Sequence, residues 1–339
     1  MSTLCVAAFT RDGAALALRI ARELGGEAWA SARYAGNGVL PMEGTVSDWA
    51  RQRFLPGNEL VFVSACGIAV RAVAPLVKSK QSDPAVVCLD DQGQFVISLL
   101  SGHLGGANAL SREIAKITGG VAAVTTATDV NGVFAVDDWA RTQGCAVVHA
   151  EQIKAVSGKL LAGEPIAVHS AYPIGGEPPA GVTLTESDTP DVWVDIRPHD
   201  DLTVVPRTLT LGVGCRRDTT RDILETRFAA FCDAAGILPQ AIGAAATIDL
   251  KANEPGLLAF CANHGWKLET YPAAELSAVQ GEFTASDFVA ETTGVDNVCE
   301  RAAVLASGGA LISRKFAGDG VTFALAERPA RLNWGEDNG

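Results

Sequence analysis

The stretch from Phe95 to Asn108 constrains the fold more than any other part of the chain. Phe95 to Leu100 is a short apolar run of the length and composition of a buried strand. The next six residues, Ser-Gly-His-Leu-Gly-Gly, are so small that they predict a tight turn. From Asn108 apolar residues recur at helical spacing, and Gly119-Gly120 is a C-terminal stop signal. His103 therefore lies in a strand-to-helix turn, where backbone N–H groups favour an anion.

The same order of strand, loop and helix recurs along the chain. Leu4–Phe9 is a predicted strand followed by a helix at Ala14–Leu24, and Leu60–Ser64 is a second strand followed by a helix. A new series begins with the predicted strand Leu209–Val213 and the helix Thr219–Ala235. This pattern predicts a multidomain α/β protein with binding sites at the carboxyl ends of its strands.

Two domains are the expectation for a chain of 339 residues, and three small ones also fit. We expect an N-terminal α/β domain with the glycine turn at 1–130, a central region at 131–205 and a separate C-terminal α/β domain at 206–328. The polar residues 329–339 are expected to form a frayed tail.

Composition disfavours several classes of partner. A formal net charge of −12 disfavours nucleic acid, which needs a basic surface, and it disfavours an anionic membrane surface. No apolar run reaches the roughly 18 residues of a membrane span. The eight cysteines are scattered without a C-x-x-C pair, which indicates reduced thiols and a cytoplasmic protein.

Two candidate sites lie in the N-terminal half. His103 is a candidate general acid or base, and a structural histidine is the alternative. Gly67-Ile-Ala-Val-Arg71 repeats the glycine turn at the second predicted strand–helix junction. Arg71 lies in the first helical turn, where the helix dipole disfavours a cation, so its position suggests an anionic partner. An exposed surface arginine is the alternative.

The counterpart in the C-terminal half is Gly212-Val-Gly-Cys-Arg-Arg217. Its glycines would let the backbone approach a ligand, and its two arginines could each bind a carboxylate. The third glycine of a dinucleotide fingerprint is absent, so we reject a dinucleotide site. Cys215 is a conceivable nucleophile, because arginines and a helix N-terminus lower the pKa of a thiol, but the sequence offers it no paired histidine.

Charged and polar residues also follow later predicted elements. Asp249 and Lys251 would share one face of a strand, either in a site or as a surface ion pair. Asn297 and Glu300 have the spacing of a helix capping box. Zinc-hydrolase and serine-hydrolase motifs are absent from the sequence, which gives those chemistries weak support.

Stretches in both halves resemble one known family. In the N-terminal half they are Gly67–Pro75, Asp83–Val87, Phe95–Asn108 and Thr125–Asp129. In the C-terminal half they are Gly212–Arg217, Thr247–Lys251, Glu254–Leu258 and Thr293–Glu300. Together they resemble the cobalt-precorrin-5A hydrolase (CbiG) family of anaerobic cobalamin biosynthesis, over residues 1 to about 328. The C-terminal part also resembles a short protein of the aerobic pathway, and the N-terminal stretches select the hydrolase.

The resemblance implies a hydrolase that acts on carbon–carbon bonds. Its substrate would be a cobalt-bearing tetrapyrrole whose δ-lactone is opened, with release of acetaldehyde, to give cobalt-precorrin-5B. It implies no protein-bound cofactor, because the substrate carries the cobalt, and it allows transient contact with neighbouring pathway enzymes. A non-catalytic carrier of corrinoid intermediates is the alternative, and an enzyme that binds nucleotide phosphates at its glycine turns is another.

This reaction needs a base, cations for the substrate carboxylates and N–H donors for a developing oxyanion. His103 is the first candidate base, and Asp249 or Glu300 is the second. The expected substrate-binding residues supply backbone donors, amides, hydroxyls or cations: Gly67, Arg71, Ser101, Gly102, Gly105, Gly106, Asn108, Gly214, Cys215, Arg216, Arg217, Thr247, Lys251 and Asn297.

Overall fold

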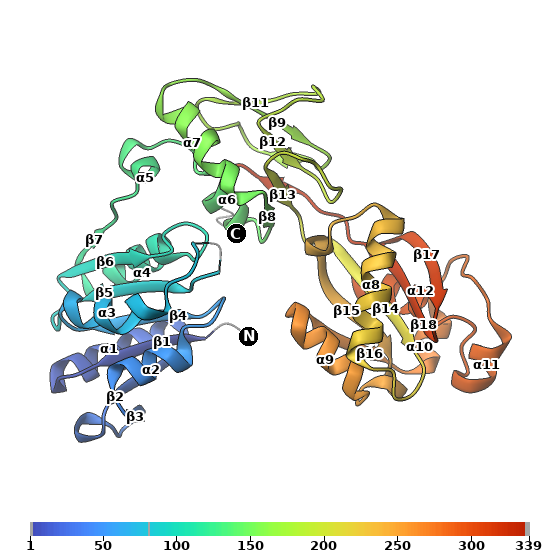
Figure 1. Cartoon of the computed structure of the whole chain (residues 1–339), viewed down its shortest axis with the longest axis horizontal. Helices are drawn as coiled ribbons and strands as arrows, with labels where there is room; N and C mark the ends of the chain where they lie inside the picture. Colours follow the sequence, from blue (N-terminus) through green and yellow to red (C-terminus); the bar gives the residue numbers. More distant parts are fainter. Residues whose placement is uncertain (1–2, 81, 336–339) are drawn as a thin grey trace. The chain divides into compact units, whose positions relative to one another are not determined.

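The computed structural model describes residues 3–80 and 82–335, and the chain divides into two compact units. The N-terminal unit comprises Met1–Arg141 and Ser157–Glu164, and the C-terminal unit comprises Thr142–Val156 and Pro165–Gly339. Both units combine helices with largely parallel sheets, so the predicted α/β class is confirmed (Figure 1). The finer division at 130/131 and 205/206 stays a prediction. None of the helices in the described part of the chain has the length and apolar content that a membrane crossing requires.

A seven-stranded sheet forms the N-terminal unit, in the order β3-β2-β1-β4-β5-β6-β7. The first five strands of this order are parallel, whereas β6 runs antiparallel to β5 and parallel to β7. Strands β5 and β6 thus form a hairpin. The strands are β1 (Leu4–Ala8), β2 (Glu27–Ser31), β3 (Val39–Met42), β4 (Glu59–Val63), β5 (Ala85–Leu89), β6 (Phe95–Leu100) and β7 (Val121–Ala123).

Helices cover both faces of this sheet. Alternate residues of β1 pack on opposite sides, Val6 against α1 and α4 and Ala7 against α2 and α3. Each face therefore has its own aliphatic core. The helices are α1 (Arg11–Leu24), α2 (Val46–Arg53), α3 (Cys66–Val73), α4 (Ala107–Thr118), α5 (Ala127–Asn131) and α6 (Val136–Thr142). Helix α1 begins three residues before the predicted start, because Thr10 caps it by accepting a hydrogen bond from the Gly13 N–H.

The C-terminal unit contains two five-stranded sheets. The first has the order β11-β9-β12-β13-β8, and only its edge strand β8 is antiparallel. Its strands are β8 (Ala146–Val148), β9 (Ile166–Ser170), β11 (Val182–Leu184), β12 (Val192–Val194) and β13 (Thr203–Val205), and α7 (Ile153–Leu161) lies between β8 and β9 in the chain.

The second sheet has the order β16-β15-β14-β18-β17. Helices α8 and α9 pack on one face, where Phe228, Phe231 and Phe260 form an aromatic core, and α10 and α12 cover the other face. The strands are β14 (Leu209–Cys215), β15 (Ile242–Ile248), β16 (Lys267–Tyr271), β17 (Ala310–Gly318) and β18 (Val321–Glu327). The helices are α8 (Arg221–Ala235), α9 (Pro255–His264), α10 (Ala273–Ala278), α11 (Asp287–Thr293) and α12 (Cys299–Ser307).

The segment expected to be a frayed tail is partly structured. Strand β19 (Leu332–Asn333) pairs in parallel with β10 (Ile174–Gly175), and the side chains of Leu332 and Trp334 are buried. The expectation is corrected for these residues, because two apolar side chains find a place against a distant loop. Residues 336–339 of the expected tail lie outside the described residues.

Candidate functional site

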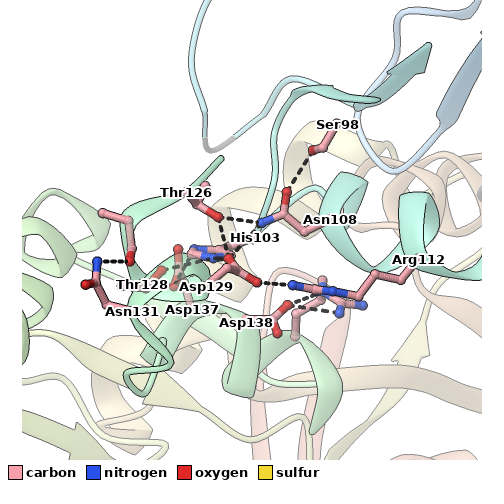
Figure 2. A network of polar contacts seen from close by, with 12 residues as sticks. Ser98, His103, Asn108, Arg112, Thr126, Thr128, Asp129, Asn131, Asp137 and Asp138 are labelled. Carbon is pink, nitrogen blue, oxygen red and sulfur yellow. Dashed lines mark hydrogen bonds and ion pairs between the residues drawn. The ribbon is translucent and has the colours of Figure 1, made fainter. Parts of the chain in front are cut away.

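A polar network lies at one edge of the seven-stranded sheet (Figure 2). Strands β6 and β7 are parallel and joined by α4, so their carboxyl ends meet at the same edge. The turn after β6 supplies His103, the first turn of α4 supplies Asn108, and the segment after β7 supplies Thr126 and Asp129. Helix α6 contributes Asp137. The βαβ arrangement thus gathers side chains that are far apart in sequence.

Both ring nitrogens of His103 face carboxylates. Nε2 lies 2.7 Å from Oδ2 of Asp129, and Nδ1 lies 3.3 Å from Oδ1 of Asp137. The Thr128 hydroxyl lies 3.3 Å from the same Nε2. The histidine side chain is only 14% exposed, so water competes little for these contacts.

This environment favours the charged imidazolium. Burial lowers the pKa of His103, but Asp137 and Asp129 outweigh it and raise the pKa to about 9. Burial raises the pKa of Asp129, but the Thr126 hydroxyl, Arg112 and His103 bring that pKa down to about 2. At neutral pH both ring nitrogens therefore carry protons. A histidine in this state can donate a proton but has no lone pair with which to accept one.

Asn108 is also committed within the network. Its Oδ1 accepts from the Ser98 hydroxyl at 2.7 Å, and its Nδ2 donates to Thr126 Oγ1 and Asp129 Oδ2, both at 3.0 Å. The side chain is buried, and Arg112 of α4 pairs with the other oxygen of Asp129. Asn108 thus fixes the start of α4 against the segment after β7.

The glycine turn satisfies part of its own backbone. The N–H groups of Gly106, Ala107 and Asn108 donate to the carbonyls of His103, Ser101 and Gly102. Gly106 has φ 87°, a left-handed conformation that favours glycine, and it closes the turn before α4. These three N–H groups are therefore unavailable to an anion, which weakens the interpretation of this turn as a phosphate or oxyanion cradle.

Gly67 and Arg71 lie at the other edge of the same sheet. They belong to α3, which follows the carboxyl end of β4, and β4 runs antiparallel to β6 through β5. Arg71 is exposed and donates from Nη1 to the Gly67 carbonyl at 3.0 Å. The structure therefore does not bring Gly67 and Arg71 together with Ser101, Gly102, His103, Gly105, Gly106 and Asn108, and Arg71 fits the alternative of an exposed surface arginine.

A pocket of about 680 Å³ opens in the C-terminal unit, at the carboxyl ends of β14 and β15. Its volume is within the usual range for small-molecule sites. It brings together every residue of the C-terminal half that the sequence predicted to bind substrate: Gly214, Cys215, Arg216, Arg217, Thr247, Lys251 and Asn297. Apolar side chains complete the wall, including Leu250 and Val289.

The charge of this pocket is mostly positive. Arg216 and Arg217 are exposed at its surface, and Lys251 and Lys315 are less exposed. Glu254 is the single acidic side chain among its described lining residues. It accepts from Lys251 Nζ at 2.8 Å and from the Asp218 N–H at 2.7 Å. These bonds, with that from Lys251 the largest contribution, lower the pKa of Glu254.

Cys215 lines the pocket in an unreactive state. Burial raises the pKa of its thiol to about 11, although the charge of Lys251 works in the other direction. No histidine is among the described residues that line this pocket. At neutral pH the Cys215 thiol therefore keeps its proton, and no lining histidine is available to remove it.

Glu300 is a structural carboxylate rather than a free base. Its side chain is fully buried and accepts from the Thr284 N–H and hydroxyl, both at 2.8 Å, and from the Lys315 N–H at 2.6 Å. Asn297 Oδ1 accepts from the Glu300 N–H at 2.9 Å, as in half of the predicted capping box. The carboxylate, however, fastens the segment at Thr284 to β17 instead of returning to Asn297.

Asp249 lies in a 3-10 turn, which corrects the predicted strand conformation. Strand β15 ends at Ile248, and the turn covers Asp249–Lys251. Lys251 consequently pairs with Glu254 and not with Asp249. Asp249 is exposed and lies in the chain between Ile248 and Leu250, which both line the pocket.

Three acidic residues of these sites, Asp129, Asp137 and Glu254, were not among the residues predicted from the sequence. Asp137 has no signal, since its contact with His103 spans 34 positions and depends on where α6 packs. Asp129 and Glu254 lie in stretches that carry the family resemblance, and the position of Asp129 three residues after Thr126 is a local cue to their hydrogen bond. Within the described residues, no group of three or more His, Cys, Asp or Glu side chains is arranged to hold a metal ion.

Comparison with known proteins places both halves of the chain in one family. Residues 48–129 match the family model described as cobalamin synthesis G N-terminal, and residues 209–326 match cobalamin synthesis G C-terminus. Cobalt-precorrin-5A hydrolase of Salmonella typhimurium (strain LT2) is 36% identical over 93% of this chain and 95% of its own length. The protein of that name from Priestia megaterium is 33% identical over 74% of this chain and 72% of its own.

A shorter relative matches a smaller part of the chain. Protein CobE from Sinorhizobium sp is 34% identical over 37% of this chain and 82% of its own length. The two hydrolases, in contrast, match over most of this chain and most of their own. The chain therefore belongs to the cobalt-precorrin-5A hydrolase family.

Proposed function

We propose that this protein is a cobalt-precorrin-5A hydrolase, which opens the δ-lactone of its cobalt-corrinoid substrate and releases acetaldehyde to form cobalt-precorrin-5B. The observation that carries this proposal is the cation-lined pocket of the C-terminal unit. It gathers the seven predicted substrate-binding residues of the C-terminal half, and four of its lining side chains are basic, in a chain whose formal net charge is −12. Such a local reversal of charge suits a ligand with many carboxylates.

The lining also suits a ring with apolar faces and a charged periphery. Leu250 is 67% exposed beside Lys251, so apolar and cationic surface adjoin each other at the pocket. Arginine binds a carboxylate through paired hydrogen bonds, and Arg216 and Arg217 are exposed where such a group could reach them. We therefore assign substrate binding to Arg216, Arg217, Lys251 and Asn297, with Gly214, Cys215 and Thr247 as wall residues.

Lactone opening and the following carbon–carbon cleavage need a proton acceptor. Asp249 is our first candidate, because its exposed carboxylate has no ion-pair partner among the described residues and adjoins the pocket in the chain. His103, which belongs to the polar network of the N-terminal unit and contacts two carboxylates there, is proposed as a proton donor within that network. Glu300 is proposed to position the pocket walls.

The test is acetaldehyde release from cobalt-precorrin-5A, measured by trapping the volatile aldehyde. Arg216→Ala and Lys251→Ala are expected to lower kcat/KM at least tenfold, because each removes a hydrogen-bonding charge from the pocket. Arg221→Ala is the matched control, since Arg221 is exposed on α8, pairs with Asp222 and lies outside the pocket. Parent-like turnover by both pocket variants would contradict this assignment.

A carrier of corrinoid intermediates is the second candidate function. It is favoured by the absence, among the described lining residues, of a histidine or an unpaired carboxylate that could act as a base. A carrier would bind the corrinoid tightly and release no acetaldehyde. Asp249→Asn separates the two functions, because it should abolish turnover by an enzyme and leave the affinity of a carrier unchanged.

We also infer a cytoplasmic location and transient contact with neighbouring pathway enzymes. The eight cysteines are all free, which fits a reducing compartment. Pull-down with the enzymes that act before and after this one would test the contact.

A further inference from the structure

Lys315 differs from the other basic side chains of the pocket. Lys251 already has a counter-charge, Glu254, at 2.8 Å, and Arg216 and Arg217 are exposed to water. Lys315 is half-buried, and within the described residues no carboxylate lies within ion-pair distance of its Nζ. It is thus a partly buried pocket cation with no counter-ion of its own among the described residues.

A cation in this position costs free energy unless an anion joins it. Removing a charge from water is unfavourable, and nearby polar groups compensate only in part. Glu300, whose carboxylate accepts from the Lys315 backbone N–H, forms no ion pair with the Lys315 Nζ within the described residues, and two other polar side chains of the pocket carry no charge. Burial raises the pKa of the Cys299 thiol to about 11, so the sulfur stays neutral, and Thr322 offers only a hydroxyl that donates to the Gly214 carbonyl.

The backbone of Lys315 is held independently of its side chain. Its N–H donates to the buried carboxylate of Glu300 at 2.6 Å, which fixes β17 against the start of α12. The side chain therefore needs no contact of its own to hold this backbone in place. A substitution at this position can change the charge of the pocket while the wall remains.

We propose that Lys315 binds a carboxylate of the corrinoid substrate and is the residue that makes the pocket select anionic over neutral tetrapyrroles. This inference rests on the proposed function for the identity of the ligand. The bound carboxylate replaces the missing counter-ion, so its contribution is larger than that of an exposed arginine, which water and salt screen. Lys315 is a binding residue here, and no bond-making step is assigned to it.

The experiment measures binding of two stable probes, a cobalt-corrin polycarboxylate and its neutral methyl ester, by titration calorimetry. The parent protein should bind the polycarboxylate more tightly than the ester. Lys315→Met should weaken polycarboxylate binding roughly tenfold or more and leave ester binding unchanged, the loss expected for a hydrogen bond to a charged group. Lys315→Arg should restore most of the difference.

Lys267→Met is the matched control, because Lys267 is exposed on β16 and lies outside the pocket. Equal polycarboxylate affinity in parent and Lys315→Met would overturn the inference, and so would an equal loss for both probes. Acetaldehyde release is scored separately. If the parent protein releases acetaldehyde but Lys315→Met binds the polycarboxylate as tightly as the parent does, this inference alone is refuted. If Lys315→Met binds the polycarboxylate more weakly but the parent releases no acetaldehyde, the proposed function alone is refuted.

Discussion

The imidazole of His103 joins two carboxylates, and this arrangement makes the stability of the N-terminal unit depend on pH. The folded-state pKa of about 9 lies above the usual value of 6.5. A raised pKa means that the folded state binds the proton more tightly than the unfolded chain does. The resulting stabilisation is fully present below pH 6.5 and is lost as the pH rises through about 9.

His103→Asn is expected to lower the free energy of unfolding by roughly 3 kcal/mol below pH 6.5. This is the free energy that corresponds to a rise in pKa from 6.5 to about 9, at about 1.4 kcal/mol for each pKa unit. The difference between parent and variant should shrink as the pH passes 9, because the parent imidazole then loses its proton. Urea unfolding of both proteins across this range measures the difference. A gap that stays constant with pH would show that the imidazolium contributes nothing.

His103 and Glu300 also show where prediction from sequence stops at the residue scale. The turn that holds His103 follows from local spacing, as does the hydrogen bond that the Glu300 N–H donates to Asn297 Oδ1. The partners that decide the chemistry, Asp137 and the Lys315 N–H, come from elements distant in sequence. A residue type at a turn indicates what it can do, but its tertiary partners determine its protonation state.

At the scale of elements, the close approach of α12 to β14 explains a glycine that looked like part of a ligand site. A Cβ at Gly212 would lie 1.8 Å from the Cys299 carbonyl oxygen, which is backbone and cannot rotate away. Gly212 therefore allows α12, which begins just after Asn297 and contains Glu300, to pack directly on the sheet. The glycine is needed for packing, and the pocket depends on it indirectly.

Gly212→Ala should destabilise the protein by about 1–3 kcal/mol or more and weaken corrinoid binding, since α12 must move away from the sheet. Gly243→Ala in the neighbouring strand β15 is the control, because its nearest atom, the Arg207 carbonyl oxygen, would be 3.3 Å away. Thermal unfolding and corrinoid titration of the two variants provide the comparison. Equal melting temperatures for both would refute the packing role.

The elements themselves could be predicted where apolar runs and stop signals coincide. Strand β6 and the helix that ends before Gly119 match the expected bounds, because each ends at glycine or polar residues. The short central strands were less legible, since three-residue strands such as β12 carry almost no periodicity. The sequence also did not indicate that Gly67 and Gly102 lie at opposite edges of the sheet. The direction of a strand is set by its pairing with other strands and not by its local sequence.

At the scale of the whole molecule, the end of the described chain supports a loop that lies far away in sequence. Strand β19 pairs with β10, Leu332 is 5% exposed, and the Trp334 N–H donates to the Gly175 carbonyl. This pairing joins two strands of the C-terminal unit that are far apart in the chain, and the strands that line the pocket lie between them in the sequence. Contacts between distant segments of one unit contribute to its cooperative unfolding.

Leu332→Ala is expected to lower the free energy of unfolding by about 2–5 kcal/mol, the usual cost of removing a buried leucine side chain. Leu184→Ala is the matched control, since Leu184 is 50% exposed on β11, the edge strand of the β11-β9-β12-β13-β8 sheet. This substitution should lower the free energy of unfolding much less. Urea unfolding measures both. Because β10 and β19 belong to the C-terminal unit, the loss should appear in the transition of that unit, and a stability equal to that of the control would mean that the last strand is dispensable.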